Sequence, residues 1–248
     1  MKITIITVVF NRTETVGQAV SSVLSQSHRD IEHIVQDGGS TDGTLEVLHG
    51  INDSRMQIVS EPDGGIYDAL NRAIARATGD VVGVVHSDDF FAHERVLERV
   101  ATVFCDPSVD GVYGDLDYVS GVDPSRVIRH WRAGTYTRSK LRYGWMPPHP
   151  TLYLRRQAFE RYGVYDTSYR IAADYEAMLR WLVQERLSPA YVPEVLVKMR
   201  VGGESNGSVR HIMRKSQEDL RAIRAHKLGG VGTLIFKNIR KIYQFIAR

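Results

Sequence analysis

Two adjacent carboxylates, Asp88 and Asp89, follow an apolar run in the stretch DVVGVVHSDDF of residues 80–90. Successive side chains of a strand point to opposite faces, so the two acids are expected to reach different partners. Mg²⁺ and Mn²⁺ typically take one or two carboxylates together with phosphate oxygens of a substrate. This acid pair therefore indicates a divalent-cation site for a phosphate-bearing ligand. The competing interpretation is that Ser87 to Asp89 only cap the helix that follows.

Further polar residues stand at the ends of the other strands predicted in the first half of the chain. Strands are expected at 2–10, 30–36, 56–61 and 80–85, with helices at 13–27, 65–79 and 94–104 and a turn leading into a short helix at 38–51. This alternation predicts a parallel sheet with helices on both faces, and such sheets bind ligands beyond the carboxyl ends of their strands. Asn11 and Arg12, Asp37, Asp63 and the acid pair are therefore expected to meet at one edge.

The pattern changes after residue 110. Shorter amphipathic strands are expected at 110–119 and 126–134, a proline-rich loop entering a strand at 144–156, helices at 155–163 and 174–186, and a last strand at 190–200. No internal repeat and no low-complexity linker separates the two halves, so the second is expected to pack directly on the first.

Composition and charge narrow the functional class. The chain has 248 residues, of which 43% are hydrophobic and 25% charged, which is typical of a globular protein. The single cysteine, Cys105, excludes an internal disulfide framework and fits a reducing compartment. The first apolar run ends at Asn11, too early for a signal peptide or a membrane span, which favours a cytoplasmic location.

Basic residues are concentrated at the C-terminus. Residues 208–248 hold ten Lys and Arg and two acids, which gives this segment a net charge of +8. Because the whole chain has a net charge of +3, residues 1–207 have a net charge of −5. The apolar residues of 233–248 recur at helical spacing among the basic ones. An amphipathic basic helix of this kind is predicted to lie on an anionic membrane surface. The alternative is a helix packed on the domain or at a homodimer interface. An acidic body disfavours nucleic acid as a partner.

Common phosphate-binding loops are missing after the first strand. The segment TVVFNRTE lacks the glycines of a dinucleotide site, and neither G-K-[ST] nor the D-x-D of aspartyl phosphatases is present. The glycine-rich loop of enzymes that make nucleotide sugars is also absent. An acidic edge without such a loop needs a cation between its carboxylates and a diphosphate.

Four motifs carry a resemblance to a known family. TVVFNR, QDGGSTDGT, DGGIYDALNRAIARATGDVVGVVHSDD and AADYEAMLRW occur in this order, and residues 3–205 resemble family 2 glycosyltransferases. The resemblance implies the α/β GT-A fold, with a Rossmann-like, mostly parallel central sheet, helices on both faces and a fused smaller acceptor-side lobe. It implies an inverting, metal-dependent transfer from a nucleotide-diphosphate sugar. The DGGIYDALNR variant is similar to the branch that builds exopolysaccharides and glycolipids.

The resemblance also implies roles for individual residues. Asp174 matches the catalytic base, and Asp89 is expected to bind Mn²⁺ or Mg²⁺ directly because Ser87 takes the first acidic place of the motif. The residues expected to bind the donor nucleotide are Phe10, Arg12, Asp37, Asp63, Asn71, Ser87 and Asp88. Within this set, Asp37 matches the acid that accepts a nucleobase N–H, and Asp88 is assigned to the ribose.

Several of these residues have simpler alternative roles. Asp37 suits a turn before two glycines, Phe10 suits the core, and Asp42 suits a helix cap. Asp63 and Asn71 are matched to the ribose and diphosphate, whereas Tyr67 and Asp68 suit the surface of the same helix. His149 and Tyr175 are assigned weakly to the sugar or acceptor pocket, and His149 is equally expected to be structural.

The metal site departs from the family pattern in a second place. Family members often carry a metal-binding histidine near the position of RVGGES, where this chain has Gly202 and Gly203; its next histidine is His211. Carboxylate and phosphate ligands alone are therefore favoured over a contribution from His211. Gly202 to Ser205 are expected to form a loop over the diphosphate.

The predicted organisation has three parts. Residues 1–110 form a nucleotide-sugar-binding half, 111–206 an acceptor-binding and catalytic half, and 207–248 a basic helical tail. A UDP-sugar donor is favoured, with GDP or dTDP as alternatives, and the acceptor is a growing glycan or a polyprenyl-linked molecule on the inner face of the cell membrane. Two rival functions are a catalytically silent scaffold that binds sugar nucleotides and a nucleotide-sugar hydrolase.

Overall fold

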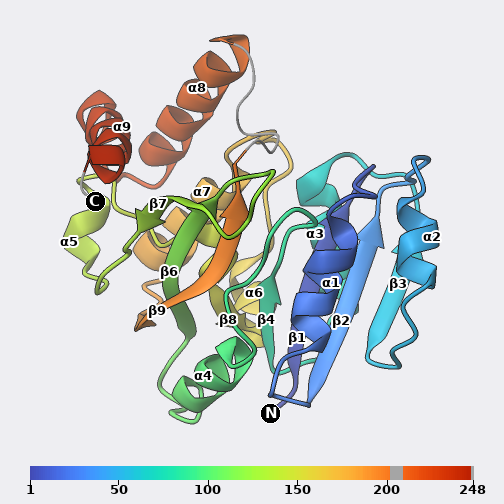
Figure 1. Ribbon diagram of the computed structural model, residues 1–248. Helices are drawn as coiled ribbons and strands as arrows, with labels where there is room; N and C mark the ends of the chain where they lie inside the picture. Colours follow the sequence, from blue (N-terminus) through green and yellow to red (C-terminus); the bar gives the residue numbers. More distant parts are fainter. Residues whose placement is uncertain (202–208, 247–248) are drawn as a thin grey trace.

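The computed structural model describes residues 1–201 and 209–246, and nine strands of this part form one sheet (Figure 1). The sheet order is β3-β2-β1-β4-β8-β6-β9-β5, and β7 also pairs with β6. The strands are β1 Ile3–Val9, β2 Ile31–Asp37, β3 Met56–Ser60, β4 Val81–Val84, β5 Phe90–Phe91, β6 Gly111–Val119, β7 Val127–Trp131, β8 Tyr153–Arg155 and β9 Pro189–Arg200.

The first four long strands are parallel, as predicted. β1 lies between β2 and β4, and Ile6 is paired with Ile34 on one side and Val84 on the other. All seven residues of β1 are buried. A parallel strand covered on both faces needs apolar side chains in both directions, which explains why this segment reads as a continuous apolar run.

Helices cover both faces of this sheet. The described helices are α1 Val16–Leu24, α2 Thr44–His49, α3 Ile66–Arg76, α4 Val96–Val103, α5 Arg138–Leu141, α6 Arg156–Tyr162, α7 Ala173–Leu179, α8 Val209–Ala225 and α9 Val231–Ile246. Ile6 and Val8 of β1 pack with α3, α6 and α7, whereas Ile3 and Ile5 pack with α1 and α4. Alternate side chains of β1 therefore pack into two separate hydrophobic cores, one on each face of the sheet.

The second half continues the same sheet. β8 is antiparallel to both β4 and β6, and β9 is parallel to β6. It follows that β6 and β9 run in the same direction as β1 to β4, so six of the nine described strands end at one edge, here called the carboxyl edge. β8 runs the other way, which brings the segment before it, the short 3₁₀ turn His149–Thr151, to that same edge.

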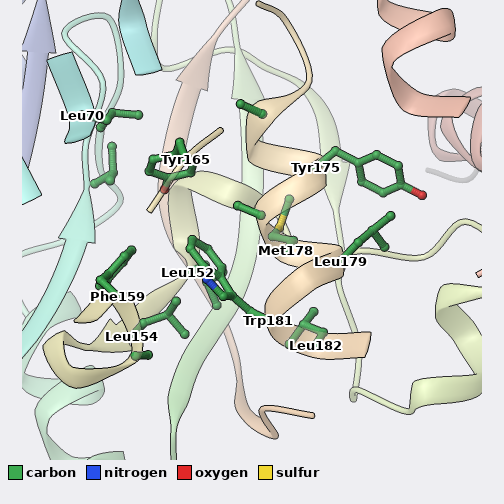
Figure 2. Packing of buried hydrophobic residues seen from close by; sticks show 14 of the residues in the cluster. Leu70, Leu152, Leu154, Phe159, Tyr165, Tyr175, Met178, Leu179, Trp181 and Leu182 are labelled. Carbon is green, nitrogen blue, oxygen red and sulfur yellow. The ribbon is translucent and has the colours of Figure 1, made fainter. Parts of the chain in front are cut away.

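The helix expected at 174–186 changes its winding midway. α7 is followed by a π-helical turn, Arg180–Gln184. At this turn the Arg180 guanidinium donates to the carbonyls of Tyr162, Gly163 and Val164, and the Trp181 indole donates to Gly163 at 3.2 Å. Trp181 also packs edge-on against Phe159 of α6, with ring centroids 5.3 Å apart (Figure 2). These contacts fix α7 against α6 on one face of the sheet.

The C-terminal helices pack on the protein on the side away from β2 and β3 (Figure 1). Glu218 of α8 is buried and accepts hydrogen bonds from the backbone N–H groups of Ile171 and Ala172, at 2.8 and 3.0 Å, just before α7. Lys237 of α9 forms a buried ion pair of 2.6 Å with Asp219. One face of the tail is therefore part of the folded body, as the alternative to membrane contact predicted.

The opposite face of α9 is apolar and exposed. Val231, Ile235 and Ile239 lie one turn apart and are each about half exposed, together with Phe236. The basic residue Arg240 is also exposed. No helix within residues 1–201 and 209–246 is long and apolar enough to cross a membrane. The side chains of residues 241–248, which the amphipathic prediction also used, lie outside the described part.

Candidate active site

The acid pair lies at the carboxyl edge, directly after β4. Asp89 is 1% exposed, and its Oδ1 accepts the backbone N–H of Arg200 at 3.3 Å. Its Oδ2 is buried and has no hydrogen-bond partner among the residues that the structure describes. Burial and the adjacent charge of Asp88 raise the pKa of Asp89 well above its usual range. Asp88 is the more exposed member of the pair, and the expected division of roles, with Asp89 on the cation and Asp88 on the ribose, stays a prediction.

Arg200 holds this turn in place. It ends β9, and its guanidinium donates to the backbone carbonyl of Asp88 and to the side chain of Gln18 in α1. The guanidinium also lies over the ring of Phe90, 5.0 Å from its centroid. The acid pair is thus fixed from three elements, β4, α1 and β9, and the sequence alone did not identify Arg200 as part of this site.

Asp174 lies at the same edge, in the first turn of α7. The single proton of the Tyr67 hydroxyl is shared between the carbonyl of Ile171 at 2.8 Å and Asp174 Oδ1 at 3.2 Å. Asp174 as a residue is half-buried. Tyr67, which was assigned to a helix surface, is instead the residue that orients the predicted base.

The Asp174 carboxylate is ionised at neutral pH. Burial would raise its pKa, but the positive charges of His149, Lys215 and Lys237 outweigh burial and leave the pKa below its usual value. His149 adds its charge only in acid, because burial lowers the pKa of His149 itself to about 4. The two lysines therefore supply the positive potential at neutral pH.

Electrostatic interactions connect Asp174 with the acid pair. Burial lowers the pKa of His86, and the charges of Asp88 and Asp174 both oppose that shift. Burial raises the pKa of Tyr118, and the charges of Asp89 and Asp174 add to it. The charges of Asp174 and of a member of the acid pair therefore both act on the same two side chains. Asp174 was not among the strand-end residues expected to converge, so this link adds to that prediction and does not test it.

His149 belongs to the wall behind Asp174. It is buried, its Nε2 lies 2.8 Å from the Tyr165 hydroxyl, and its ring stacks on His86 at 6.0 Å between centroids. Tyr165 in turn lies 5.7 Å from the ring of Tyr67. These contacts are those of a structural histidine, so a direct role of His149 in binding sugar or acceptor stays a prediction.

A second group at the carboxyl edge surrounds Gly38. A Cβ added at Gly38 would lie 2.8 Å from Asp63 Oδ2 and 3.4 Å from the ring of Phe10. Phe10 is 58% exposed, which excludes the core role considered for it. The Arg12 guanidinium donates to the backbone carbonyl of Asn11 at 3.0 Å beside this group. An exposed aromatic ring beside a carboxylate and a bare backbone forms a surface suited to a flat base.

Asp37 is engaged by its own turn. Its Oδ2 accepts hydrogen bonds from the N–H groups of Gly39 and Ser40, at 2.9 and 3.0 Å, and from the Ser60 hydroxyl at 2.6 Å. Its Oδ1 accepts from the Ser40 hydroxyl, and the residue is fully buried. The structure thus gives Asp37 the turn-forming role that was its simpler alternative, and a contact with a nucleobase stays a prediction.

Asn71 also has a structural partner. Its amide nitrogen donates to the carbonyl of Tyr165 at 2.8 Å, and its oxygen accepts the N–H of the same residue at 2.9 Å. Both ends of the amide are thus used to join α3 to the segment after α6. Its predicted contact with ribose or diphosphate is not supported by this arrangement.

The remaining predicted residues lie around these groups. Ser87 is buried in the turn before the acid pair. Tyr175 is 2% exposed and turned away from Tyr165 (Figure 2), and the Lys237 ammonium lies 3.2 Å from its ring centroid. His211 has an Nε2 without a partner among the described residues, and Gly202 to Ser205 lie outside them.

The acid pair has the chemistry of a divalent-cation site. A buried carboxylate oxygen without a partner beside a second, more exposed carboxylate is a hard, negatively charged ligand set. In the described part of the chain, no group of three or more His, Cys, Asp or Glu side chains is arranged to hold a metal. A cation bound here would need further oxygen ligands from a substrate or water.

Comparisons with known proteins agree with this arrangement. The sequence model of Glycosyl transferase family 2 matches residues 4–167. An uncharacterized glycosyltransferase of Mycobacterium tuberculosis is 33% identical over 181 residues, which are 72% of this chain and 68% of that protein. A PGL/p-HBAD biosynthesis glycosyltransferase of Mycobacterium bovis is 31% identical over 193 residues, 75% of this chain and 72% of the relative.

Solved structures with the same architecture include two sugar-nucleotide complexes. A mannosyltransferase of Pyrobaculum calidifontis, in complex with GDP-Man and Mn²⁺, superposes with a TM-score of 0.67 at 20% identity over 92% of this chain. Residues 1–349 of TarS from S. aureus, in complex with UDP-GlcNAc, superpose with a TM-score of 0.67 at 18% identity over 91%. This chain spans 65% of each. These likenesses confirm the predicted GT-A fold.

Proposed function

The chain belongs to Glycosyl transferase family 2 and is a glycosyltransferase, and we propose that it moves a sugar from a nucleoside-diphosphate donor to an acceptor hydroxyl with inversion at the anomeric carbon. One observation carries the proposal. An ionised carboxylate beside the Tyr67 hydroxyl and the acid pair Asp88 and Asp89 stand at the same sheet edge, and the charges of both act on His86 and Tyr118. Attack from behind the leaving group requires these two functions at one cleft.

Asp174 is proposed as the general base. Its lowered pKa keeps it ionised at neutral pH, and the residue is only half-buried. The Tyr67 hydroxyl donates to Oδ1, so Oδ2 is the oxygen that remains for the acceptor proton. Removing that proton as the hydroxyl attacks avoids a positively charged acceptor oxygen in the transition state.

The acid pair is proposed to hold Mn²⁺ or Mg²⁺ together with oxygens of the donor diphosphate. When bound, the cation would neutralise charge on the leaving diphosphate. Arg200 keeps Asp88 and Asp89 in place by its contacts with the backbone of the turn and with α1. The Pyrobaculum relative, whose structure contains Mn²⁺, supports this part of the proposal.

The group around Gly38 is proposed to receive the nucleobase. Phe10 offers an exposed ring for stacking, and Asp63 offers a carboxylate oxygen next to a position with no side chain. UDP is the favoured nucleotide, with GDP or dTDP as alternatives; the solved relatives contain UDP-GlcNAc in one case and GDP-Man in the other. Asp63 is a better candidate than Asp37 for a nucleobase N–H, because Asp37 is fully buried in its own turn.

The acceptor is proposed to be a growing glycan or a lipid-linked molecule at the inner face of the cell membrane. The exposed apolar face of α9 and its neighbour Arg240 support contact with an anionic membrane surface. The relative named for PGL/p-HBAD biosynthesis supports this branch of the family. In a test of membrane contact, Ile235→Ser/Ile239→Ser should sediment less with anionic vesicles than the parent chain; equal sedimentation would exclude the α9 face.

The donor is identified by a binding and turnover screen. In the presence of Mn²⁺, one of the UDP-, GDP- or dTDP-sugars should raise the melting temperature of the protein, because a ligand that binds the native state stabilises it. At a concentration about 100 times its Kd, that ligand adds about 2.7 kcal/mol to the free energy of unfolding. EDTA should abolish the shift.

Turnover of the same donor separates the three candidate functions. Transfer of a labelled sugar to a polyprenyl-linked or oligosaccharide acceptor would support the proposal. Release of free sugar at the same rate with and without acceptor would indicate a hydrolase. Binding without either product in the presence of a range of acceptors would indicate a sugar-nucleotide-binding scaffold.

A further inference from the structure

A second cavity lies away from the site described above. It has a volume of about 770 Å³ and is lined by α5, the end of the π-helical turn and the loop between α8 and α9. Pockets for small molecules have volumes of about 300–1,000 Å³. Asp174 and Val183 stand at opposite ends of the continuous helix formed by α7 and the π-helical turn, on the order of 13 Å apart along its axis. The cavity is therefore distinct from the candidate active site.

The lining of this cavity is strongly basic. Arg138, Arg142, Arg186 and Lys227 contribute four positive charges, and no carboxylate is among the lining residues. One guanidinium nitrogen of Arg138 donates to the carbonyl of Val183 at 2.8 Å, which holds this side chain at the wall. Within residues 1–201 and 209–246, the side chains of Arg142, Arg186 and Lys227 have no hydrogen-bond or ion-pair partner, so the charges are not neutralised internally.

Two of these cations occupy backbone positions that favour glycine. Arg186 and Lys227 have φ values of 59° and 53°, and among the described residues Asn11 is the third non-glycine residue with positive φ. Lys227 follows α8 in a motif in which the N–H of Leu228 bonds to the carbonyl of Ile223, where glycine is the usual residue. A non-glycine residue at such a position costs backbone energy relative to glycine, and both residues placed here are cationic.

The simplest explanation for these cations is that they balance the negative ends of the helix dipoles at the cavity. The dipole charge is too small to account for all four of them. Each helix C-terminus carries about half a negative charge, so the ends of α5, the π-helical turn and α8 contribute about −1.5 in total. The four cations exceed this by about two and a half charges. His226 does not change the balance, because its Nε2 is directed to Glu176 at 2.9 Å. A surplus of positive charge thus remains for an external anion.

We propose that this cavity binds a phosphorylated ligand, a diphosphate or a phosphate ester carrying two or more negative charges. Guanidinium groups bind phosphate oxygens in pairs of parallel hydrogen bonds, and three of the four cations are arginines. Tyr143 follows Arg142 in the chain, and its ring centroid lies 5.7 Å from that of Phe236 in α9. The cavity therefore adjoins the exposed apolar face of that helix. A membrane lipid headgroup and a soluble diphosphate are the two sources of this chemistry.

The test uses one variant that removes charge without adding strain. Arg186→Gly/Lys227→Gly should keep or raise the melting temperature, because glycine adopts positive φ without penalty. Binding of inorganic pyrophosphate is measured by calorimetry in EDTA, which prevents cation-dependent binding at the acid pair. Sedimentation with phosphatidylcholine vesicles, with and without phosphatidylglycerol, measures the lipid source. Arg142→Gln provides a second variant with an unchanged backbone, and Arg29→Gln/Arg126→Gln removes two exposed charges elsewhere.

The two cavity variants should weaken pyrophosphate binding, or the preference for phosphatidylglycerol vesicles, at least tenfold, while the control variant retains both. Loss of pyrophosphate binding alone identifies a soluble ligand, and loss of vesicle preference alone identifies a lipid headgroup. If both cavity variants bind both probes as the parent chain does, or if the parent chain binds neither, the cavity is not an anion site and the proposal is overturned.

Discussion

Asp174→Asn is expected to lower kcat for sugar transfer by about 10²–10⁴-fold while leaving the affinity for the donor nucleotide unchanged. Asparagine preserves the size of the side chain and the oxygen that accepts the Tyr67 hydroxyl, so the geometry of the α7 start is retained. The variant loses the ability to take the proton from the acceptor hydroxyl. The measurements are steady-state transfer rates and calorimetric binding of the nucleoside diphosphate, with Glu160→Gln as a control carboxylate from the exposed side of α6.

The pH dependence of the parent enzyme gives a second test of Asp174. The pKa of this carboxyl is lowered from its usual value, so the active, ionised form is present throughout the neutral range. The rate should therefore fall only as the pH drops below the ordinary carboxyl range near 4, and the Asn variant should lack that limb. A near-wild-type rate in Asp174→Asn, or an acid limb that survives the substitution, would assign the proton to another group.

Tyr67 shows why Asp174 could be selected from the sequence whereas its surroundings could not. The motif AADYEAMLRW identified the acid by resemblance, and the start of a helix was visible in the sequence. Its hydrogen-bond donor lies 107 residues earlier, on a helix whose periodicity indicated only a buried and an exposed face. A contact between two helices depends on how both pack against the sheet, and neither segment contains that information.

Asp37 shows the opposite case, in which a local pattern was underweighted. The sequence DGGS is typical of an aspartate that accepts hydrogen bonds from its own turn, and the structure has that turn. The third partner, Ser60, comes from β3, where it pairs with Asp37 in the parallel register. The strand could be predicted from its apolar residues, but its register could not, and the register decides whether Asp37 is free to bind a ligand.

The tail illustrates a limit of amphipathic patterns. Apolar residues at helical spacing among lysines and arginines fit both a membrane surface and a protein surface, and α9 has both kinds of face. Lys237 is the informative residue, because a lysine is normally exposed and here it is buried against Asp219 and Tyr175. Its partners are 18 and 62 residues away, so the sequence pattern did not distinguish this buried lysine from the exposed basic residues around it.

The second large effect concerns the acid pair. Asp89→Asn is expected to weaken Mn²⁺-dependent binding of a nucleoside diphosphate by at least about 10–100-fold, the loss usually seen when even an outer partner of a metal ligand is removed. Asparagine keeps an oxygen for the Arg200 N–H and removes a carboxylate that is costly to ionise beside Asp88. The metal-free variant should therefore be at least as stable as the parent chain, and only the stabilisation by metal and nucleotide should disappear.

Asp88→Asn is the matched variant, because it removes the same charge one residue away from a more exposed position. If Asp88 contacts the ribose and Asp89 the cation, the Asp88 variant should weaken nucleotide binding equally with Mn²⁺ and with EDTA, whereas the Asp89 variant should weaken only the Mn²⁺-dependent part. If instead the Asp88 variant lost only the Mn²⁺-dependent part of binding, the direct cation contact would belong to Asp88, whose greater exposure permits it. Retention of Mn²⁺ dependence in both variants would remove the acid pair from the cation site, because the only buried carboxylate oxygen left without a partner in the described residues would then have no role in binding it.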